Sequence, residues 1–551
     1  MGPMATLRFR RSAAQLHALT QLEREIRACD SYARRKYLRD FNAAFRNYES
    51  VLDSRQLTAA YRAADVLLVG DYHALPASQR FASGLIRQLS AGRPVVLALE
   101  MVFSRHQNIL DDWRAGAIGR GELRERIRFD RDWGYHWPPF CEILETGRTH
   151  ARAIYGLDCM PRNDLRRIGA RDRHAAAKIA EIRECHPEAA VVVLFGEAHL
   201  APGHIPGLLR DRRPQDRVLT VLQNVDALYW RAAGEMCSRV EAVRVCDKVI
   251  CVFNSTPLEK YESYRLWLDR WRSQSVSTPD LAPVVYNLID ALLRFLNIDK
   301  YSASNHTQPR FMVDQLPEVY SGASDERVRR LLAGRVEEES EIRQVLARLE
   351  QQGCCYVPQV RAVLVREFRL AQGAEEAARL VHRVCRAASA QPGAQSAEDR
   401  FYSCVLEDAL SYFGSRALHA PRAPAREADL SALCALPPEE VEALHLGSPR
   451  EFRQLIDFLL LHKHYEANLR RYRACPPMLS AGVRCEGNAF RFLTRQLGYL
   501  LGSELYDAYL DGRLAKRFLR SLFFRSLERP GAPRTIYFAT QRKLRRRKRP
   551  S

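Results

Sequence analysis

The stretch Val191-Val192-Val193-Leu194-Phe195-Gly196-Glu197-Ala198-His199 decides the fold that the sequence predicts. It is an unbroken apolar run that ends at a glycine, an acid and, two residues later, a histidine. Continuous β-branched runs of this kind are typical of strands that helices cover on both faces of a sheet. The glycine permits a sharp turn where the strand ends. We therefore expect Glu197 and His199 to follow the carboxyl end of a buried strand, where open α/β sheets bind ligands.

Two earlier stretches have the same design. Residues 66–73 run through Val66-Leu67-Leu68-Val69 to Gly70-Asp71-Tyr72-His73, and residues 94–100 end at Glu100. Equivalent positions at the ends of neighbouring parallel strands would bring His73, Glu100 and His199 together, although the two histidines are 126 residues apart.

Strand and helix patterns alternate across residues 61–255, which favours an α/β domain with a mainly parallel sheet sandwiched by helices. The expected strands are Val66–Val69, Val95–Leu99, Ala153–Leu157, Val191–Phe195, Val218–Leu222 and Val249–Phe253. The expected helices between them are Ser78–Leu89, Leu123–Phe129, Pro138–Thr149, Asp164–Cys185 and His204–Leu209.

The rest of the chain shows helical periodicity. Residues 1–60 are expected to form a helical N-terminal cover on the sheet. Ser255-Thr256-Pro257 predicts a helix start, because a hydroxyl side chain precedes a proline at the first helical position. We expect residues 256–526 to be all-α, in one or two subdomains, and residues 527–551 to form a basic tail.

Histidines and carboxylates at strand ends suit two kinds of chemistry. A neutral imidazole can act as a general base near neutral pH or ligate a transition metal. His73, His199 and Glu100 form the predicted metal-ligand set, for Fe, Zn, Mn or Co. The predicted catalytic set adds Asp71 and Glu197, which can orient the imidazoles or activate water. In the alternative interpretation, each histidine only caps its strand with a local hydrogen bond.

The aromatic stretch at residues 132–140, Asp-Trp-Gly-Tyr-His-Trp-Pro-Pro-Phe, suggests a cleft for a flat apolar ligand. The side chains expected to bind such a cofactor are Tyr72, Tyr135, His136, Trp137 and Arg171. Tyrosine and histidine are known axial ligands of haem iron, and an arginine can hold an anionic ligand group. The alternative is a packed loop without a ligand.

Charge, cysteine content and the absence of known motifs restrict the partners, locations and enzyme classes that the sequence supports. The formal net charge is +20, and Arg542–Arg549 holds seven basic residues and no acid, which suggests contact with an anionic surface. The 14 cysteines include no CxxC pair, which favours a reducing compartment. No apolar leader or lipoprotein cleavage pattern starts the sequence, and no apolar run is long enough to span a membrane, so we expect a cytoplasmic location. Phosphate-loop, GxSxG and HExxH motifs are absent from the sequence.

The paired motifs Gly70-Asp71-Tyr72-His73 and Gly196-Glu197-Ala198-His199, with Glu100 between them, resemble the GxxH motifs and glutamate of the Tiki superfamily. Within it, the sequence is most similar to the ChaN family of haem-binding uptake proteins, over residues ~60–255. Further similar blocks are Leu97–Met101, the stretch to Trp137-Pro138, Arg171–His174 and Gly196–Leu200 before Ile205-Pro206. The chain departs from the family in having Asp71 where Glu is common, in lacking the lipoprotein signal, and in its long helical half.

This resemblance implies an α/β domain with a site formed by the two GxxH turns and Glu100. Relatives of this kind include haem-binding lipoproteins, metal-dependent proteases and erythromycin esterases, and a shared fold does not choose among them. Three functions therefore follow: a haem- or iron-binding protein, a metal-dependent or His/Glu-dependent hydrolase, and a non-catalytic interaction protein. The expected ligand is haem or another small molecule.

Overall fold

The computed structural model describes residues 3–29, 36–159, 168–235, 240–273, 279–300, 315–336, 338–386, 396–443, 446–468 and 476–545. The chain divides into two compact units. Residues 22–277 form one, here called the α/β unit. Residues 1–21 and 278–551 form the other, here called the helical unit.

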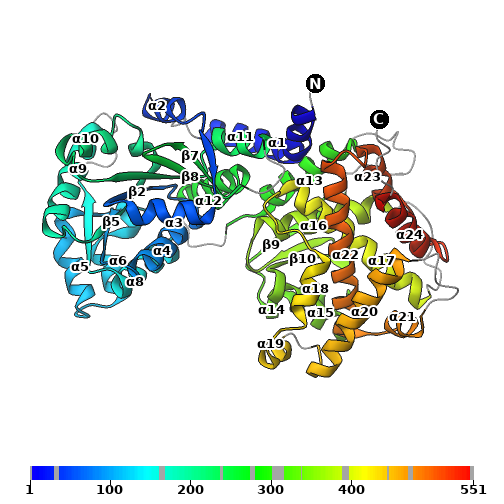
Figure 1. The fold of residues 1–551 in the computed structure, drawn as a ribbon. Coiled ribbons are helices and arrows are strands. Elements are labelled where there is room, and N and C mark those ends of the chain that lie inside the picture. The colour runs from blue at the N-terminus through cyan, green and yellow to red at the C-terminus, as the bar shows by residue number, and fades with distance from the viewer. Residues whose placement is uncertain are drawn as a thin grey trace. The chain divides into compact units, whose positions relative to one another are not determined.

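The α/β unit is built on an eight-stranded sheet with the order β1-β7-β8-β6-β2-β5-β3-β4 (Figure 1). Its strands are β1 (Ser50–Leu52), β2 (Val66–Asp71), β3 (Val95–Phe103), β4 (Ala153–Asp158), β5 (Ala190–Gly196), β6 (Val218–Gln223), β7 (Ala242–Cys246) and β8 (Val249–Val252). All six strands expected from the sequence are present. Short β1 and β7 were not predicted, and they pair antiparallel at one edge of an otherwise parallel sheet.

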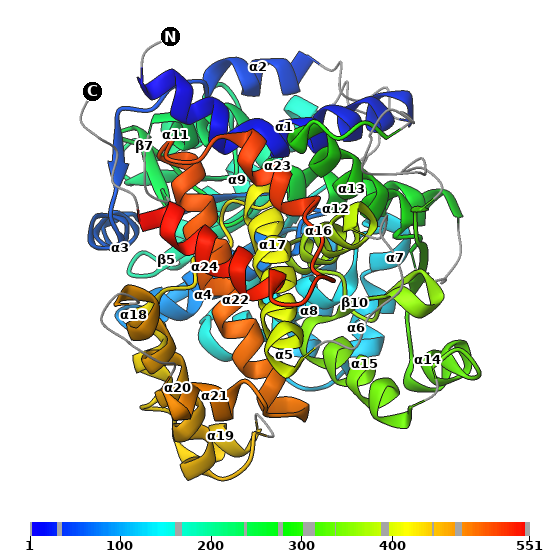
Figure 2. The ribbon, with the colours of Figure 1, turned by 90° about the vertical axis from the view of Figure 1, so that its right-hand side faces the viewer.

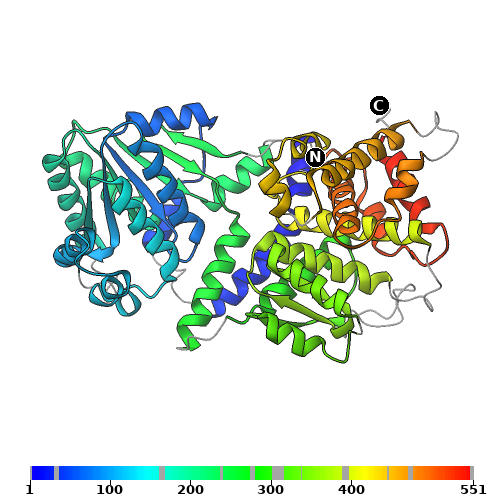
Figure 3. The same cartoon turned by 90° about the horizontal axis from the view of Figure 1, so that it is seen from below.

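Helices cover both faces of this sheet, which confirms the predicted sandwich (Figure 3). Alternation along each strand divides the core: Leu67 and Val69 face one helical layer, and Val66 and Leu68 face the other. The helices of the unit beyond α1 (Pro3–Cys29) are α2 (Lys36–Ala44), α3 (Ser54–Ala63), α4 (Pro76–Ser90), α5 (Gln107–Arg114), α6 (Arg120–Arg126), α7 (Phe129–Asp132), α8 (Trp137–His150), α9 (Ile168–Cys185), α10 (Ile205–Arg212), α11 (Asp226–Glu235) and α12 (Pro257–Ser273).

Strand register aligns the ends that carry the predicted site. In the parallel pair β2–β5, Asp71 lies opposite Gly196. On the other side of β5, Leu99 of β3 lies opposite Leu194, so Glu100 follows at the same edge. The central position of β5 in this trio therefore places the first GxxH turn on one side of the second and Glu100 on the other.

The helical unit contains twelve described helices, which confirms a helical C-terminal region, together with a small sheet that the predicted all-α region did not include. Helices α17 and α22 run side by side through its middle (Figure 2). The helices are α13 (Ala282–Leu296), α14 (Asp325–Leu332), α15 (Glu339–Gln352), α16 (Leu370–Arg386), α17 (Ala397–Leu418), α18 (Glu427–Leu433), α19 (Pro438–Ala443), α20 (Pro449–Ala467), α21 (Pro477–Gly482), α22 (Gly487–Leu510), α23 (Lys516–Phe523) and α24 (Ala532–Arg545). The sheet has the order β10-β11-β9, formed by β9 (Glu318–Ser321), β10 (Cys354–Val357) and β11 (Ala362–Val365).

The start of α1 packs with the helical unit. Ala13, Ala14 and Ala18 are buried. Asn287 of α13 donates a hydrogen bond from Nδ2 to the carbonyl oxygen of Ala18, at 3.1 Å. These contacts join the first residues of the chain to a helix that lies 269 residues later.

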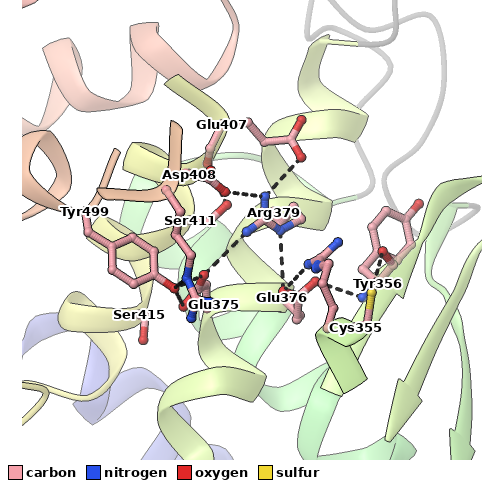
Figure 4. Close-up of polar contacts among 12 residues, drawn as sticks. Cys355, Tyr356, Glu375, Glu376, Arg379, Glu407, Asp408, Ser411, Ser415 and Tyr499 are labelled. Carbon is pink, nitrogen blue, oxygen red and sulfur yellow. Dashed lines mark hydrogen bonds and ion pairs between the residues drawn. The ribbon is translucent and has the colours of Figure 1, made fainter. Parts of the chain in front are cut away.

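A buried ion network crosses the interior of the helical unit (Figure 4). Arg379 of α16 donates to Glu407 and Asp408 of α17, at 3.1 and 2.9 Å, and contacts Glu375 and Glu376 at 3.4 Å. Burying charges costs free energy that only close pairing offsets. The network therefore ties α16 to α17 in one arrangement.

Helix α24 covers residues 532–545 of the predicted basic tail at 527–551, and residues 546–551 lie outside the described residues. Among the described helices, none has the length and apolar character that crossing a membrane requires.

Candidate functional site

Three predicted side chains converge above Gly196. His73 Nε2 lies 3.7 Å from Glu100 Oε2, and His199 Nε2 lies 4.0 Å from Glu100 Oε1. A Cβ at Gly196 would approach Glu100 Oε2, His73 Nε2 and His199 Cδ2 to 3.2, 3.3 and 3.4 Å. A larger residue at this position would crowd the three functional groups by a few tenths of an ångström, and glycine leaves them room.

An aspartate holds each imidazole at Nδ1. Asp71 Oδ2 lies 2.8 Å from His73 Nδ1, and Asp172 Oδ1 lies 2.5 Å from His199 Nδ1. The other oxygen of Asp71 accepts a hydrogen bond from Gln79. Because a carboxylate accepts the Nδ1 proton, the neutral form of each imidazole has its lone pair on Nε2. Both basic nitrogens are thus turned toward the same glutamate.

Glu100 is fixed by donors from two directions. The backbone N–H of Gly196 donates to Oε2 at 2.6 Å, and Arg171 Nη2 donates to Oε1 at 2.7 Å. Arg171 also forms a two-pronged ion pair with Asp158. Burial opposes the charge on Arg171, but Glu100 and Asp158 outweigh it and raise the pKa of the guanidinium. Arg171 therefore stays charged and fixes Glu100, and its predicted contact with a ligand stays a prediction.

Asp172 also binds His204, whose Nδ1 lies 2.6 Å from Asp172 Oδ2. Burial opposes ionisation of Asp172, but its hydrogen bonds to His199 and His204 outweigh burial and lower its pKa. The hydrogen bond to Asp172 raises the pKa of His204 above 6.5, with a smaller contribution from the charge of Asp40. One carboxylate thus orients two imidazoles, one of which faces the Glu100 group.

The side chain of Glu197 forms its ion pair with another element. Lys260 of α12 lies 3.0 Å from Glu197 Oε1, and its ammonium group lies 4.7 Å from the centre of the Tyr72 ring. Burial disfavours the charged lysine, but Glu197 and Asp226 outweigh it and raise the pKa of Lys260. Of the five predicted catalytic residues, the structure groups His73, Asp71, Glu100 and His199, and pairs Glu197 with α12.

Two aromatic rings pack against the partly exposed His73. Its ring centre lies 4.4 Å from that of Trp133 and 5.2 Å from that of Tyr135. Tyr135 stacks on Trp267 of α12 at 4.8 Å, and Trp267 stacks on Tyr264 at 5.4 Å. The predicted aromatic loop is therefore packed against α12 as well as against the site.

The residues predicted to hold haem have different surroundings, and their role in binding it stays a prediction. Burial raises the pKa of Tyr72 well above 10, as does the nearby Glu197, which disfavours the phenolate that would bind iron. His136 is exposed at the start of α8. Trp137 packs edge-on against Phe129, at 4.7 Å between ring centres. Tyr72, Tyr135 and Trp137 are partly exposed, and His136 is the most exposed of these four side chains.

The predicted metal set is close-packed rather than open. Within the residues that the structure describes, no group of three or more His, Cys, Asp and Glu side chains has an arrangement that could hold a metal ion. Both oxygens of Glu100 already accept hydrogen bonds from Arg171 and Gly196. The metal site at His73, His199 and Glu100 stays a prediction.

Sequence reasoning missed several contributors to the site. Asp172 stood within the family-like block Arg171–His174 but received no role of its own, and His204 was read only as a helix start. Asp158 directly follows the expected strand Ala153–Leu157 but was also given no individual role. No sequence pattern indicated Lys260, because it lies in a charged helix that is distant in sequence from the other site residues. The signal that points to Asp158 is a carboxylate directly after an expected apolar strand, as at Glu100, although β3 continues past Glu100 to Phe103.

Comparisons with known proteins agree with the fold of this unit. Residues 57–172 match the family model for haem-binding uptake proteins, Tiki superfamily, ChaN. The match confirms the resemblance to ChaN over this segment, which includes His73, Glu100, Arg171 and Asp172. His199 and Glu197 lie beyond the matched residues. No curated protein matches the chain.

Two solved structures are similar to part of the chain. ChaN of Campylobacter jejuni, described with cofacial haem binding, is 17% identical, with a TM-score of 0.25, covering 31% of this chain and 86% of its own. The type III effector HopBA1 is 13% identical, with a TM-score of 0.28, covering 38% of this chain and 96% of its own.

Proposed function

We propose that the α/β unit is a hydrolase in which His73 is the general base. The observation that carries this proposal is the pair of Asp-held imidazoles that turn Nε2 toward one buried glutamate. A lone pair on Nε2 and a carboxylate oxygen 3.7 Å away both accept hydrogen bonds, so they attract a donor such as water. This arrangement suits activation of a water molecule.

In the proposed reaction, water attacks the carbonyl carbon of an ester or amide while His73 Nε2 takes its proton. Asp71 orients the ring and stabilises the imidazolium that forms. The bond to the leaving group then breaks, and the proton passes from the imidazolium of His73 to the leaving oxygen or nitrogen. His73 is favoured over His199 as the base, because its side chain is 21% exposed against 8%.

The test is hydrolysis of a panel of aryl and alkyl esters and amides by the full chain and by His73→Ala. Loss of a general base lowers kcat by about 10²–10⁴. His150→Ala is the matched control, because His150 is exposed at the end of α8, and its kcat is expected to equal that of the unaltered chain. Turnover that survives in His73→Ala would contradict the proposal.

Metal content of the purified protein separates two versions of this mechanism. Turnover that a chelator removes and Zn, Mn or Co restores would assign a metal to the same histidines. Turnover that persists after the chelator supports His73 acting directly as the base.

Haem binding is the second candidate, favoured by the family match over residues 57–172 and by the aromatic rings around His73. Here the candidates tested for contact with haem are Tyr135, which packs beside His73, and the exposed His136. Titration of the full chain with haem is expected to give a Soret band that Tyr135→Phe or His136→Ala weakens, whereas His150→Ala leaves it unchanged. An unaltered haem spectrum at stoichiometric protein would remove this candidate.

A further inference from the structure

A second surface, in the helical unit, has features of a binding site that do not depend on the proposed hydrolase. Residues 513–551 contain 14 Lys and Arg side chains and one acid, Glu528, so they carry +13 of the formal net charge of +20. A concentration of positive charge of this kind is typical of a surface that binds polyanions. The structure describes this segment as far as Arg545, in α23 and α24.

A groove lies between α23 and α24, here called the basic groove. Phe518, Leu522 and Ile536 form its apolar part, and Arg525, Arg542 and Lys543 supply its charge. The ammonium group of Lys543 lies 4.3 Å from the centre of the Phe518 ring. The two helices thus combine cations with the aromatic ring of Phe518 in one concave surface.

Several cations of this surface lack acidic partners in the described part of the chain, although Arg513 and Arg545 pair with Asp511 and Glu466. Arg517, Arg525, Arg542 and Lys543 have no ion pair with a carboxylate there, whereas Arg534 pairs with Glu398. Without such partners, their charge is available to an external anion. Eleven of the 14 basic side chains in residues 513–551 are arginines, which bind phosphate groups in a two-pronged geometry.

We infer that the basic groove binds the phosphate backbone of a single-stranded nucleic acid. A positive groove with aromatic side chains is the usual design for this ligand, and it needs no sequence readout. An anionic membrane fits less well, because insertion needs exposed apolar groups. In the described residues, the exposed large apolar side chains are Leu16 and Met478, which lie outside α23 and α24.

The test measures fluorescence anisotropy of a labelled single-stranded RNA of about 20 nucleotides with the full chain. The groove variant R517Q/R525Q/R542Q/K543Q removes four exposed or groove-lining cations. We expect its affinity to fall at least about tenfold at about 50 mM salt, and the slope of log K against log salt to become less steep by up to about 3, because each phosphate contact contributes about 0.7.

The matched control is R335Q/R343Q/R450Q/R484Q, which removes four exposed arginines from other elements of the same unit. Its affinity should stay within about twofold of the unaltered chain, since it removes the same net charge but leaves the groove intact. Deletion of residues 546–551 separates the groove from the remaining tail, and this variant should bind more tightly than the groove variant. Circular dichroism of every variant checks the fold.

Several outcomes would overturn the inference. These are no RNA binding at low salt, equal losses in the groove variant and its control, or loss on tail deletion alone. Poly-glutamate that competes as well as RNA would assign the groove to an acidic protein. Equal, groove-dependent binding to phosphatidylserine vesicles would assign it to a membrane surface.

Discussion

Asp172 is the residue on which the orientation of His199 depends, and it shares its charge with His204. The raised pKa of His204 makes this link dependent on pH. Stabilisation from the ion pair is fully present below 6.5, the ordinary pKa of histidine, and is lost as the pH rises through the higher pKa of folded His204. It is also lost in acid, as the pH falls from 3.8 through the lowered pKa of Asp172.

His204→Gln is therefore expected to lower the free energy of unfolding by about 1.5 kcal/mol at about pH 5.5, and by less at about pH 8.5. The measurement is urea unfolding followed by tryptophan fluorescence. All six tryptophans lie between residues 113 and 271, so the signal reports the α/β unit.

His186→Gln provides a control of opposite sign in the same unit. Burial, together with the charge of Arg152, lowers the pKa of His186 below 6.5. Protonation therefore favours the unfolded chain at this position, and the substitution should help most in acid. Identical pH trends for the two variants would show that the ion pair with Asp172 does not control stability.

The sequence predicted best which residues come together at the candidate site. His73, Glu100 and His199 end recognisable apolar runs, and parallel register then brings them together. Hydrogen-bond partners were harder to predict, because Asp172 and Lys260 come from helices whose rotation and approach no local pattern specifies. Glu197 shows the same limit: its position after β5 was predicted, but its ion pair depends on α12.

At the scale of elements, α12 is attached to the sheet edge by one buried cation. Lys260 is 5% exposed and pairs with Glu197. Trp267 adds a hydrogen bond from Nε1 to the carbonyl oxygen of Gly134, at 3.1 Å. The helix thereby holds the aromatic loop beside His73.

Lys260→Met is expected to destabilise the α/β unit by about 3 kcal/mol, because it leaves buried Glu197 without its cation. Adding Glu197→Gln should restore part of this loss. The difference between the loss in the double variant and the summed losses of the two single variants measures the interaction between the two side chains. Lys178→Met is the control, since the Lys178–Glu181 pair is exposed and should change stability by less than about 1 kcal/mol. Similar losses at both lysines would contradict the role given to Lys260.

The sequence predicted whether a segment forms a strand or a helix wherever its apolar pattern was long. The six parallel strands are continuous apolar runs, and they were predicted. Strands β1 and β7 at the sheet edge, and β9 to β11 in the helical unit, have three to five residues each. Runs this short carry no decisive period, because pairing partners stabilise them rather than their own pattern.

At the scale of the whole molecule, both units contain buried ion pairs, and those of the helical unit govern its stability in acid. In the helical unit, burial would raise the pKa of Glu375, but Arg422 and Arg379 outweigh it and lower that pKa to about 2. The pKa of Glu466 is also lowered to about 2, because hydrogen bonds from His462 and the charge of Lys463 outweigh its burial. The stability that these groups supply is present above 4.5 and is lost as the pH falls toward 2.

Arg379→Met should therefore raise the midpoint of acid unfolding of the helical unit by about one pH unit, because it leaves neighbouring carboxylates buried without their cation. Far-ultraviolet circular dichroism follows this loss of helix, while tryptophan fluorescence follows the α/β unit. The exposed pair Arg330–Glu326 supplies the control Arg330→Met, which is expected to leave the midpoint unchanged. A fluorescence midpoint that moves together with the circular dichroism would argue against an effect confined to the helical unit.

The hydrogen bond between Ala18 and Asn287 has a consequence for biosynthesis. A ribosome that adds about 5–20 residues per second needs roughly 13 to 54 seconds to make the 269 residues that separate them. During that interval, the beginning of α1 has left the exit tunnel, and its native partner does not yet exist. We expect nascent chains of intermediate length to recruit chaperones through this first helix, and release to follow translation of α13.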